Sequence, residues 1–272
     1  MTATVESPSN EAAADRKVPL VELRNVGKSY GNITALKDIS LRVHAGQVTG
    51  ILGDNGAGKS TLIKIIAGLH QQTEGELLVD GEATKFSSPA DALGKGIATV
   101  YQNLAVVPLM PVWRNFFLGQ EIRKKSFPWS LDANAMRATT LAELSKMGIE
   151  LPDVDAPIGS LSGGQRQCVA IARAVFFGAR VLILDEPTAA LGVKQSGVVL
   201  KYITAAKEAG FGVVFITHNP HHAHMVGDHF VLLNRGRQKL DCTYDEISLE
   251  HLTQQMAGGD ELQALSHELG RK

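Results

Sequence analysis

Two glycine-rich stretches of this chain contain residues that can bind phosphate. The first, GDNGAGKST at 53–61, fits the spacing G-x-x-x-x-G-K-[ST]. Its glycines allow successive backbone N–H groups to curl around a phosphate, Lys59 can reach the β- and γ-phosphates, and the Ser60 hydroxyl is a ligand for Mg²⁺. This stretch therefore predicts a site for a nucleoside triphosphate.

The surroundings of this motif favour a nucleotide site over a glycine turn with an incidental lysine. In a glycine-rich chain of this length the bare pattern arises by chance about once in fifty sequences, so the surroundings carry the prediction. An apolar strand, VTGILG, precedes the motif, and in KSTLIKIIAGL after it Leu62, Ile65, Ile66 and Leu69 recur at helical spacing. A helix that starts near Lys59 would direct its positive end at the phosphate.

The stretch VLILDEPT ends an apolar strand in Asp185 and Glu186. Ligands of parallel α/β sheets bind beyond the carboxyl ends of the strands. We therefore expect this strand to lie beside the phosphate-loop strand, with both acids facing the γ-phosphate. Asp185 would hold Mg²⁺, and Glu186 would orient and deprotonate the attacking water. The alternative is an acidic pair that merely follows a buried strand.

A further apolar strand, VVFIT, leads into His218. A neutral imidazole at this position can donate to the γ-phosphate. His221, His222 and His224 follow on a helix predicted over Pro220 to Val226, and some of their spacings would suit a metal. We favour a solvated helix, because no cysteine or carboxylate completes a ligand set.

Strands alternate with helices along most of the chain, which predicts an α/β fold with a mostly parallel sheet and helices on both faces. From about 112 to 177 the segments RNFFLGQEI, LDANAMRATTLAELSKMG and GGQRQCVAIARAVFF all favour helix. We interpret this region as an inserted helical subdomain. Residues 1–19 lack the apolar region of a signal peptide and are expected to be a disordered lead, while 260–272 form a tail.

The composition argues against several other classes of protein. The 27 Lys and Arg against 28 Asp and Glu leave a net charge of −1, without the basic field that holds nucleic acid. The most apolar window, 168–184, is interrupted by Arg173, Gly178 and Arg180, whereas a membrane span needs about 20 apolar residues. Cys168 and Cys242 are expected to be buried thiols in a reducing compartment.

The motifs GDNGAGKST, YQN, LSGGQ, ILDEPT and ITHN, in this order over residues 20–259, resemble the nucleotide-binding subunit of an ATP-binding cassette (ABC) transporter. The resemblance implies a P-loop NTPase (RecA-like) core with an antiparallel β subdomain and a helical subdomain that carries the LSGGQ signature. In that family two cassettes face each other head to tail with two ATP molecules between them. The second glycine stretch is thereby implied to complete a partner's site.

The resemblance also assigns roles to individual positions. Tyr30 resembles the aromatic that stacks on adenine, and Gln102 the glutamine that contacts Mg²⁺ and water. The implied catalytic residues are Lys59, Gln102, Glu186 and His218, and the implied Mg²⁺ ligands are Ser60, Gln102 and Asp185. The implied nucleotide-binding set is Tyr30, Gly53, Asp54, Asn55, Gly56, Ala57, Gly58, Lys59, Ser60, Thr61, Ser162, Gly163, Gly164 and Gln165.

Phrases such as EPTAALGVK and LTQQMAGG resemble sugar-import cassettes of the ribose, fructose and xylose type. This implies a homodimer at the cytoplasmic face of the membrane, bound to two membrane-spanning permease subunits and served by an extracytoplasmic sugar-binding protein, with no role for nucleic acid. The apolar stretch at 104–119 resembles the surface that receives a permease helix. The alternative, that these side chains are core of the subdomain, is expected to account for more than half of them. Gly192 stands where most cassettes have an aspartate that links the two sites, which puts strong coupling between them in doubt.

Three other functions fit part of this pattern. An ATP-gated dimerisation module with vestigial hydrolysis is compatible with Gly192, but Glu186 and His218 argue against it. A soluble cassette in translation or DNA repair usually carries paired cassettes, coiled-coil arms or basic patches. An importer of amino acids or metals shares the catalytic motifs, and only the sugar-type phrases oppose it.

Overall fold

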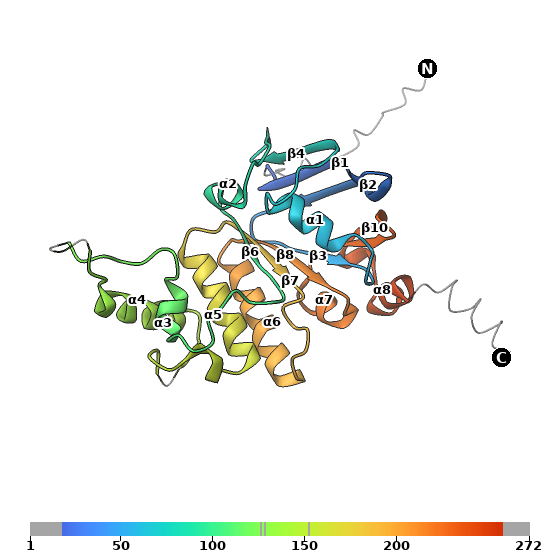
Figure 1. Ribbon diagram of the computed structural model, residues 1–272. Helices are drawn as coiled ribbons and strands as arrows, with labels where there is room; N and C mark the ends of the chain where they lie inside the picture. The colour runs from blue at the N-terminus through green and yellow to red at the C-terminus, as the bar shows by residue number, and fades with distance from the viewer. Residues whose placement is uncertain (1–17, 126, 128, 152, 258–272) are drawn as a thin grey trace, which may run out of the picture.

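The computed structural model describes residues 18–125, 127, 129–151 and 153–257. Most of the expected lead at 1–19 and the whole tail at 260–272 lie outside these ranges. Figure 1 shows a central sheet, an antiparallel sheet above it and a group of helices that extends to one side.

The central sheet has six strands in the order β10-β9-β3-β8-β7-β6. All neighbours pair in parallel except β10 and β9, which form an antiparallel hairpin. The middle strands β3 and β8 are buried along their whole length, as expected for strands covered on both faces. The strands are β3 (Val48–Leu52), β6 (Ile97–Val100), β7 (Val181–Asp185), β8 (Gly212–Thr217), β9 (His229–Asn234) and β10 (Arg237–Thr243).

One expectation about this sheet is wrong. The acidic strand β7 does not lie beside the phosphate-loop strand β3, because β8 pairs with both and separates them. Each strand looks locally like a buried apolar run, so the order is decided by pairing between segments far apart in the chain.

Helices cover both faces of the central sheet (Figure 1). One face packs on α5 (Gly163–Phe176), α6 (Val193–Glu208), α7 (Pro220–Val226) and α8 (Leu249–Met256). The other packs on α1 (Lys59–Ile66) and α2 (Pro89–Gly94). Alternate side chains of each strand serve the two cores, so Leu184 lies in the first and Ile183 in the second.

The antiparallel sheet, in the order β2-β1-β4-β5, covers α1 (Figure 1). Its strands are β1 (Val21–Tyr30), β2 (Ile33–Val43), β4 (Glu74–Val79) and β5 (Glu82–Ala83). Together the two sheets confirm the expected α/β fold, with a mostly parallel core and a separate antiparallel sheet.

The helical region contains α3 (Val112–Phe116), α4 (Ala133–Lys146) and α5. Helix α3 is shorter than expected, because the backbone turns after Phe117 and Gly119 adopts a φ of 81°. A positive φ is incompatible with a right-handed helix, so the stretch after Phe117 is not helical.

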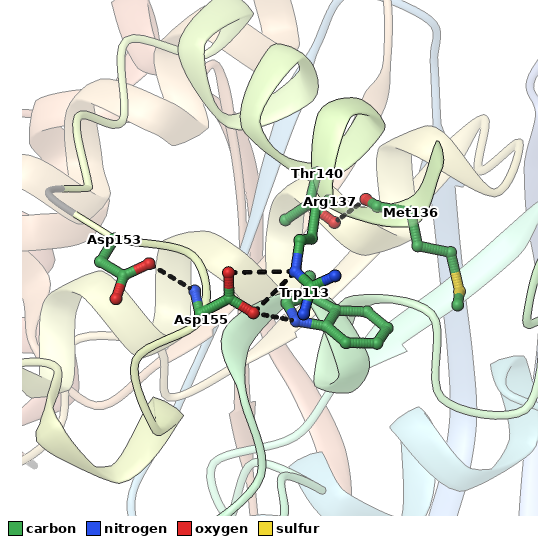
Figure 2. Close-up of polar contacts among 6 residues, drawn as sticks. All are labelled: Trp113, Met136, Arg137, Thr140, Asp153 and Asp155. Carbon is green, nitrogen blue, oxygen red and sulfur yellow. Dashed lines mark hydrogen bonds and ion pairs between the residues drawn. The ribbon is translucent and has the colours of Figure 1, made fainter. Parts of the chain in front are cut away.

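Asp155 holds this region together through side-chain contacts (Figure 2). Its Oδ1 accepts hydrogen bonds from Trp113 Nε1 at 2.8 Å and Arg137 Nε at 2.7 Å, and its backbone N donates to Asp153 Oδ1 at 2.8 Å. The Arg137 guanidinium also lies 4.8 Å from the centroid of the Trp113 ring. One carboxylate thus joins α3 and α4 to the loop before the signature, and its hydrogen bonds to Arg137 and then to Trp113 lower its pKa.

The two cysteines differ in burial. Cys168 on α5 is buried as expected, and desolvation raises its pKa to about 12. Cys242 is only half-buried, because it lies on the edge strand β10. Across the described ranges, no helix combines the length and apolar character that a membrane crossing requires.

Candidate active site

A cavity of about 530 Å³ lies at the carboxyl ends of β3 and β7. The phosphate loop forms one wall, and the acidic residues after β7 form another. Of the residues identified from the sequence, the cavity brings together Asp54, Asn55, Gly56, Gly58, Lys59, Ser60, Thr61, Gln102, Asp185 and Glu186.

The backbone of the phosphate loop adopts a conformation that favours glycine. Gly53 has a φ of 145°, and a Cβ there would lie 2.4 Å from the carbonyl oxygen of Leu233. Gly58 has a φ of 106° and forms the N-cap of α1, with no side-chain hydrogen bond to the first turn. The amides of Lys59 and Ser60, the first two of α1, are thus available to an anion at the positive end of the helix, whereas those of Thr61 and Leu62 donate to the Gly58 carbonyl.

Lys59 is 8% exposed and bends back over the loop. Its ammonium donates to the carbonyl oxygens of Gly53 and Asp54. Burial lowers its pKa, while the charges of Glu186, Asp54 and Asp185 act in the opposite direction. A buried ammonium held by backbone carbonyls is a group that phosphate oxygens can recruit at little cost.

Asp185 and Glu186 occupy the end of β7 and the residue after it. Burial, and then the neighbouring charge of Glu186, raises the pKa of Asp185, and Lys59 opposes this rise. Glu186 adopts a left-handed φ of 48°, and its backbone N donates to the Ile216 carbonyl at 3.0 Å. Because of this left-handed backbone, the Glu186 side chain does not continue the alternation of side chains along β7. Left-handed residues other than glycine cluster at functional sites.

The Glu186 carboxylate has one anchored and one unpartnered oxygen. Oε1 lies 2.9 Å from Nδ1 of His218, which follows β8 and is 60% exposed. Oε2 is buried and has no hydrogen-bond partner. A buried acceptor without a donor is costly, so this oxygen is suited to receive a hydrogen from a bound molecule.

The residues expected to hold Mg²⁺ bring suitable atoms to one cavity. Ser60 supplies a hydroxyl, Gln102 an amide oxygen and Asp185 a carboxylate, all hard oxygen donors of the kind Mg²⁺ prefers. Within the described ranges, His, Cys, Asp and Glu side chains form no group of three or more that could hold a metal ion. Of the three histidines considered for a metal, His222 places its Nδ1 3.0 Å from Thr188 Oγ1, and His224 stacks on the Phe230 ring.

Tyr30, at the end of β1, does not line the cavity, although the neighbouring residues Ile33, Thr34 and Ala35 do. Its side chain is 42% exposed. Lys28 Nζ lies 5.1 Å from the ring centroid, and His70 makes an edge contact at 5.7 Å. Stacking of adenine on Tyr30 stays a prediction.

The signature residues lie apart from the cavity lining, at the start of α5. Ser162 is the N-cap and accepts a hydrogen bond from Gln165 N at 3.2 Å, while Gln165 Oε1 accepts one from Ser162 N at 2.9 Å. This capping box fixes the helix start. Gly163 and Gly164 pack against Leu191 and Gln195 of the same chain.

Comparisons with known proteins identify the family. A family model described as ABC transporter matches residues 36–189, more than half of the chain. The chain belongs to the ABC transporter family. It is an ATP-binding ATPase subunit of that family, whose hydrolysis of ATP is coupled to transport.

Two curated relatives indicate which type of ABC transporter subunit this chain resembles. The xylose/arabinose import ATP-binding protein XylG of Sulfolobus acidocaldarius is 42% identical over 237 residues, which cover 87% of this chain and 93% of that protein. The fructose import ATP-binding protein FrcA of Rhizobium meliloti is 43% identical over 225 residues, which cover 81% and 86%. These matches confirm the resemblance to cassettes of the sugar-import type.

A solved structure supports the fold. A dimeric ATP-binding cassette in a post-hydrolysis state, bound to ADP and Pi, is 29% identical, with a TM-score of 0.69. The alignment covers 82% of this chain and 98% of that one. The P-loop NTPase fold expected from the motifs is thereby confirmed.

Sequence reasoning missed five residues that line the cavity of this ABC ATPase. They are Ile33, Thr34, Ala35, Arg235 and Gly236. The first three begin β2 and the last two form the turn between β9 and β10. Neither segment carries a nucleotide-binding motif, and only the packing of both against the phosphate loop brings them to the site.

Proposed function

We propose that this chain is the ATP-hydrolysing subunit of an importer for a monosaccharide, and that it acts as a head-to-tail homodimer with two ATP molecules at the interface. The names of the xylose/arabinose and fructose relatives support a sugar as the transported molecule. The proposal that the chain hydrolyses ATP at this site rests on one observation, namely that Lys59, Asp185 and Glu186 line the same cavity.

In the proposed reaction, the amides of the phosphate loop and the Lys59 ammonium bind the β- and γ-phosphates. Glu186 orients a water molecule and accepts its proton as the oxygen attacks the γ-phosphorus and the bond to the β-γ bridging oxygen breaks. His218 holds Oε1 of Glu186, which leaves Oε2 to take the proton once the carboxylate turns toward the cavity.

Ser60, Gln102 and Asp185 are the proposed ligands of Mg²⁺. When bound, Mg²⁺ supplies positive charge beside the β- and γ-phosphate oxygens. The hydroxyl, amide and carboxylate oxygens of these residues suit it.

Dimerisation is proposed because the signature does not line the cavity of its own chain. Ser162 offers its hydroxyl, and Gly163 and Gly164 offer their N–H groups at the positive end of α5. In a head-to-tail dimer they would contact the γ-phosphate held by the partner's phosphate loop. A similar cassette solved with ADP and Pi is dimeric, which supports the proposal of a dimer.

An apolar groove is the proposed docking surface for the permease. It has a volume of about 290 Å³ and runs between β6 and α5, with Val100, Leu104, Val106 and Ile158 in its lining. Leu109 on the following loop is 88% exposed. We place the chain as a peripheral subunit at the cytoplasmic face of the membrane, bound to two permease subunits and served indirectly by a sugar-binding protein.

The decisive experiment measures ATP turnover per subunit against protein concentration, for the wild type and Glu186→Gln. We expect the wild-type rate per subunit to rise with concentration and the variant to lose at least about 100-fold. Glu208→Gln, an exposed change at the end of α6, is the control and should behave as wild type. Unchanged turnover in Glu186→Gln would disprove the assigned base.

The substrate class needs a separate test. Purified permease subunits are reconstituted with the chain in proteoliposomes, and ATP-dependent uptake of labelled pentoses, fructose and amino acids is compared. Uptake of a sugar alone supports the proposal. Uptake of an amino acid in place of any sugar would refute it while leaving the ATPase assignment intact.

A further inference from the structure

The turn between β9 and β10 has a demanding backbone geometry. Asn234 pairs with Arg237 across the hairpin, so Arg235 and Gly236 form a two-residue turn. Their φ angles are 48° and 75°. Two central residues with positive φ define a type I′ turn, which favours asparagine, aspartate or glycine at the first position. Arginine breaks this preference.

The turn is fixed against the phosphate loop. Gly236 N donates to the Ala57 carbonyl at 3.0 Å, and Lys37 N donates to the Gly236 carbonyl at 2.8 Å. A Cβ on Gly236 would lie 2.4 Å from the carbonyl oxygen of Ala35. The backbone of Arg235 is therefore held in place by both the phosphate loop and β2.

Arg235 is one of two cationic residues among the described residues that line the nucleotide cavity, and Lys59 is the other. Asp54, Asp185 and Glu186 line the same cavity, so without Arg235 the acids would outnumber the bases by three to one. Arg235 also lines a neighbouring cavity of about 240 Å³, on the far side of the phosphate loop beside the end of α8. A planar guanidinium is well suited to bind phosphate oxygens, and often does so with two parallel hydrogen bonds.

We propose that Arg235 is a nucleotide-binding residue that contacts a phosphate oxygen of the bound nucleotide. A left-handed residue that opposes the local turn preference, at the rim of a phosphate cavity, is the kind of strain that functional sites retain. The proposal rests on nucleotide binding in this cavity and not on hydrolysis, dimerisation or the transported substrate.

The test compares Arg235→Asn with Arg237→Asn in the full chain, by calorimetric titration with ATP, ADP and adenosine. Asparagine suits the turn, so Arg235→Asn should fold with an unchanged or higher thermal midpoint. Loss of a charged hydrogen bond should weaken ATP and ADP binding about tenfold or more and leave adenosine binding unchanged. Arg237 does not line the cavity, so Arg237→Asn should bind all three ligands as wild type does.

A second variant separates charge from shape. Arg235→Lys keeps one positive charge but not the planar fork, so its affinity for ATP and ADP should lie between those of the wild type and Arg235→Asn. The proposal is wrong if Arg235→Asn and Arg237→Asn bind ATP and ADP equally. It is also wrong if adenosine binding falls by the same factor, because the contact would then not be to phosphate.

Discussion

The two glycine-rich stretches of this ABC ATPase use glycine for different physical reasons. In the phosphate loop, Gly53 and Gly58 adopt positive φ angles that L side chains rarely adopt. In the signature, Gly163 is helical, and a Cβ there would lie 2.6 Å from Leu191 Cδ2. The first stretch needs an unusual backbone shape in addition to space, whereas in the second only the space for a side chain is limiting.

The surroundings of the two stretches differ as well. Lys59, Asp185 and Glu186 bring charges of both signs to the phosphate loop. At the signature, Ser162 and Gln165 are engaged in a capping box, and the helix end is the main source of positive potential. The first is therefore suited to bind a nucleotide and the second only to complete a site.

The largest expected effect is at Lys59. In Lys59→Met the phosphates lose their buried cation, and we expect turnover to fall by a factor on the order of 10³. The fold should be unharmed, since burial already disfavours the charged lysine. Steady-state ATPase assays and thermal unfolding without nucleotide check both points. Lys64→Met, exposed on the same helix, is the control.

A substitution in the signature tests whether this stretch completes a partner's site. In Gly163→Asp the new Cβ displaces the end of the flexible Leu191 side chain, and the acid in the first turn of α5 would repel a partner's γ-phosphate and reduce turnover about 100-fold. A 1:1 mixture with Lys59→Met forms heterodimers with one intact site, so about a quarter of wild-type turnover should return. No recovery on mixing would mean that each chain completes its own site.

Stability should separate the glycines of the phosphate loop. Gly53→Ala places a Cβ against a backbone carbonyl and should lower the free energy of unfolding by about 2 kcal/mol or more. Gly56 has a φ of 84°, but a Cβ there would have no atom within 4 Å. Gly56→Ala should therefore lower the free energy of unfolding by only about 1 kcal/mol. Urea unfolding measures both, and equal losses would contradict the packing argument.

A smaller effect is expected at Gly192, the N-cap of α6. Its φ of −69° and the open space around it admit a side chain. Gly192→Asp should stabilise the chain by a few tenths of a kcal/mol through helix capping. If the absent aspartate weakens coupling between sites, the variant should also show a steeper dependence of turnover on ATP concentration. An unchanged dependence would separate residue 192 from coupling.

The smallest effect is a pH dependence at His222, whose Nδ1 lies 3.0 Å from Thr188 Oγ1. Burial, with the nearby His221 and His218, lowers the pKa of His222 below 6.5 in the folded chain. Its contribution to stability is therefore complete above pH 6.5 and is lost as the pH falls through the lower folded-state pKa. His222→Gln should flatten this slope in unfolding curves between pH 7 and 5, whereas His251→Gln should not.

Local patterns predicted much of the fold. The strand, loop and helix around Lys59 and the helix from Pro220 to Val226 follow from apolar spacing and turn residues. The position of β8 between β3 and β7 could not be predicted in this way, since pairing between distant segments decides it. The turn after Phe117 was not predicted either, because the segment RNFFLGQEI has a sequence that favours helix.

The site shows the same division. Residues in recognised motifs, such as Lys59 and Glu186, were identified because their chemistry depends on local spacing. Arg235 was not, because a β-hairpin gives no sign in sequence of which cavity it will adjoin. Thr34 reaches the cavity for a similar tertiary reason.

The position of β8 also sets how far apart opposite charges lie. Neighbouring strands are about 4.8 Å apart, so β3 and β7 are separated by roughly 10 Å. Across the residues described, no ion pair within 4.0 Å joins Lys59 to Asp185 or Glu186. An incoming nucleotide therefore has no salt bridge to break, and its triphosphate enters a gap whose two sides already carry opposite charge. His218 directly follows β8, the strand that separates these charges. One strand therefore sets both the width of the gap and the hydrogen-bond partner of Glu186, the proposed catalytic base.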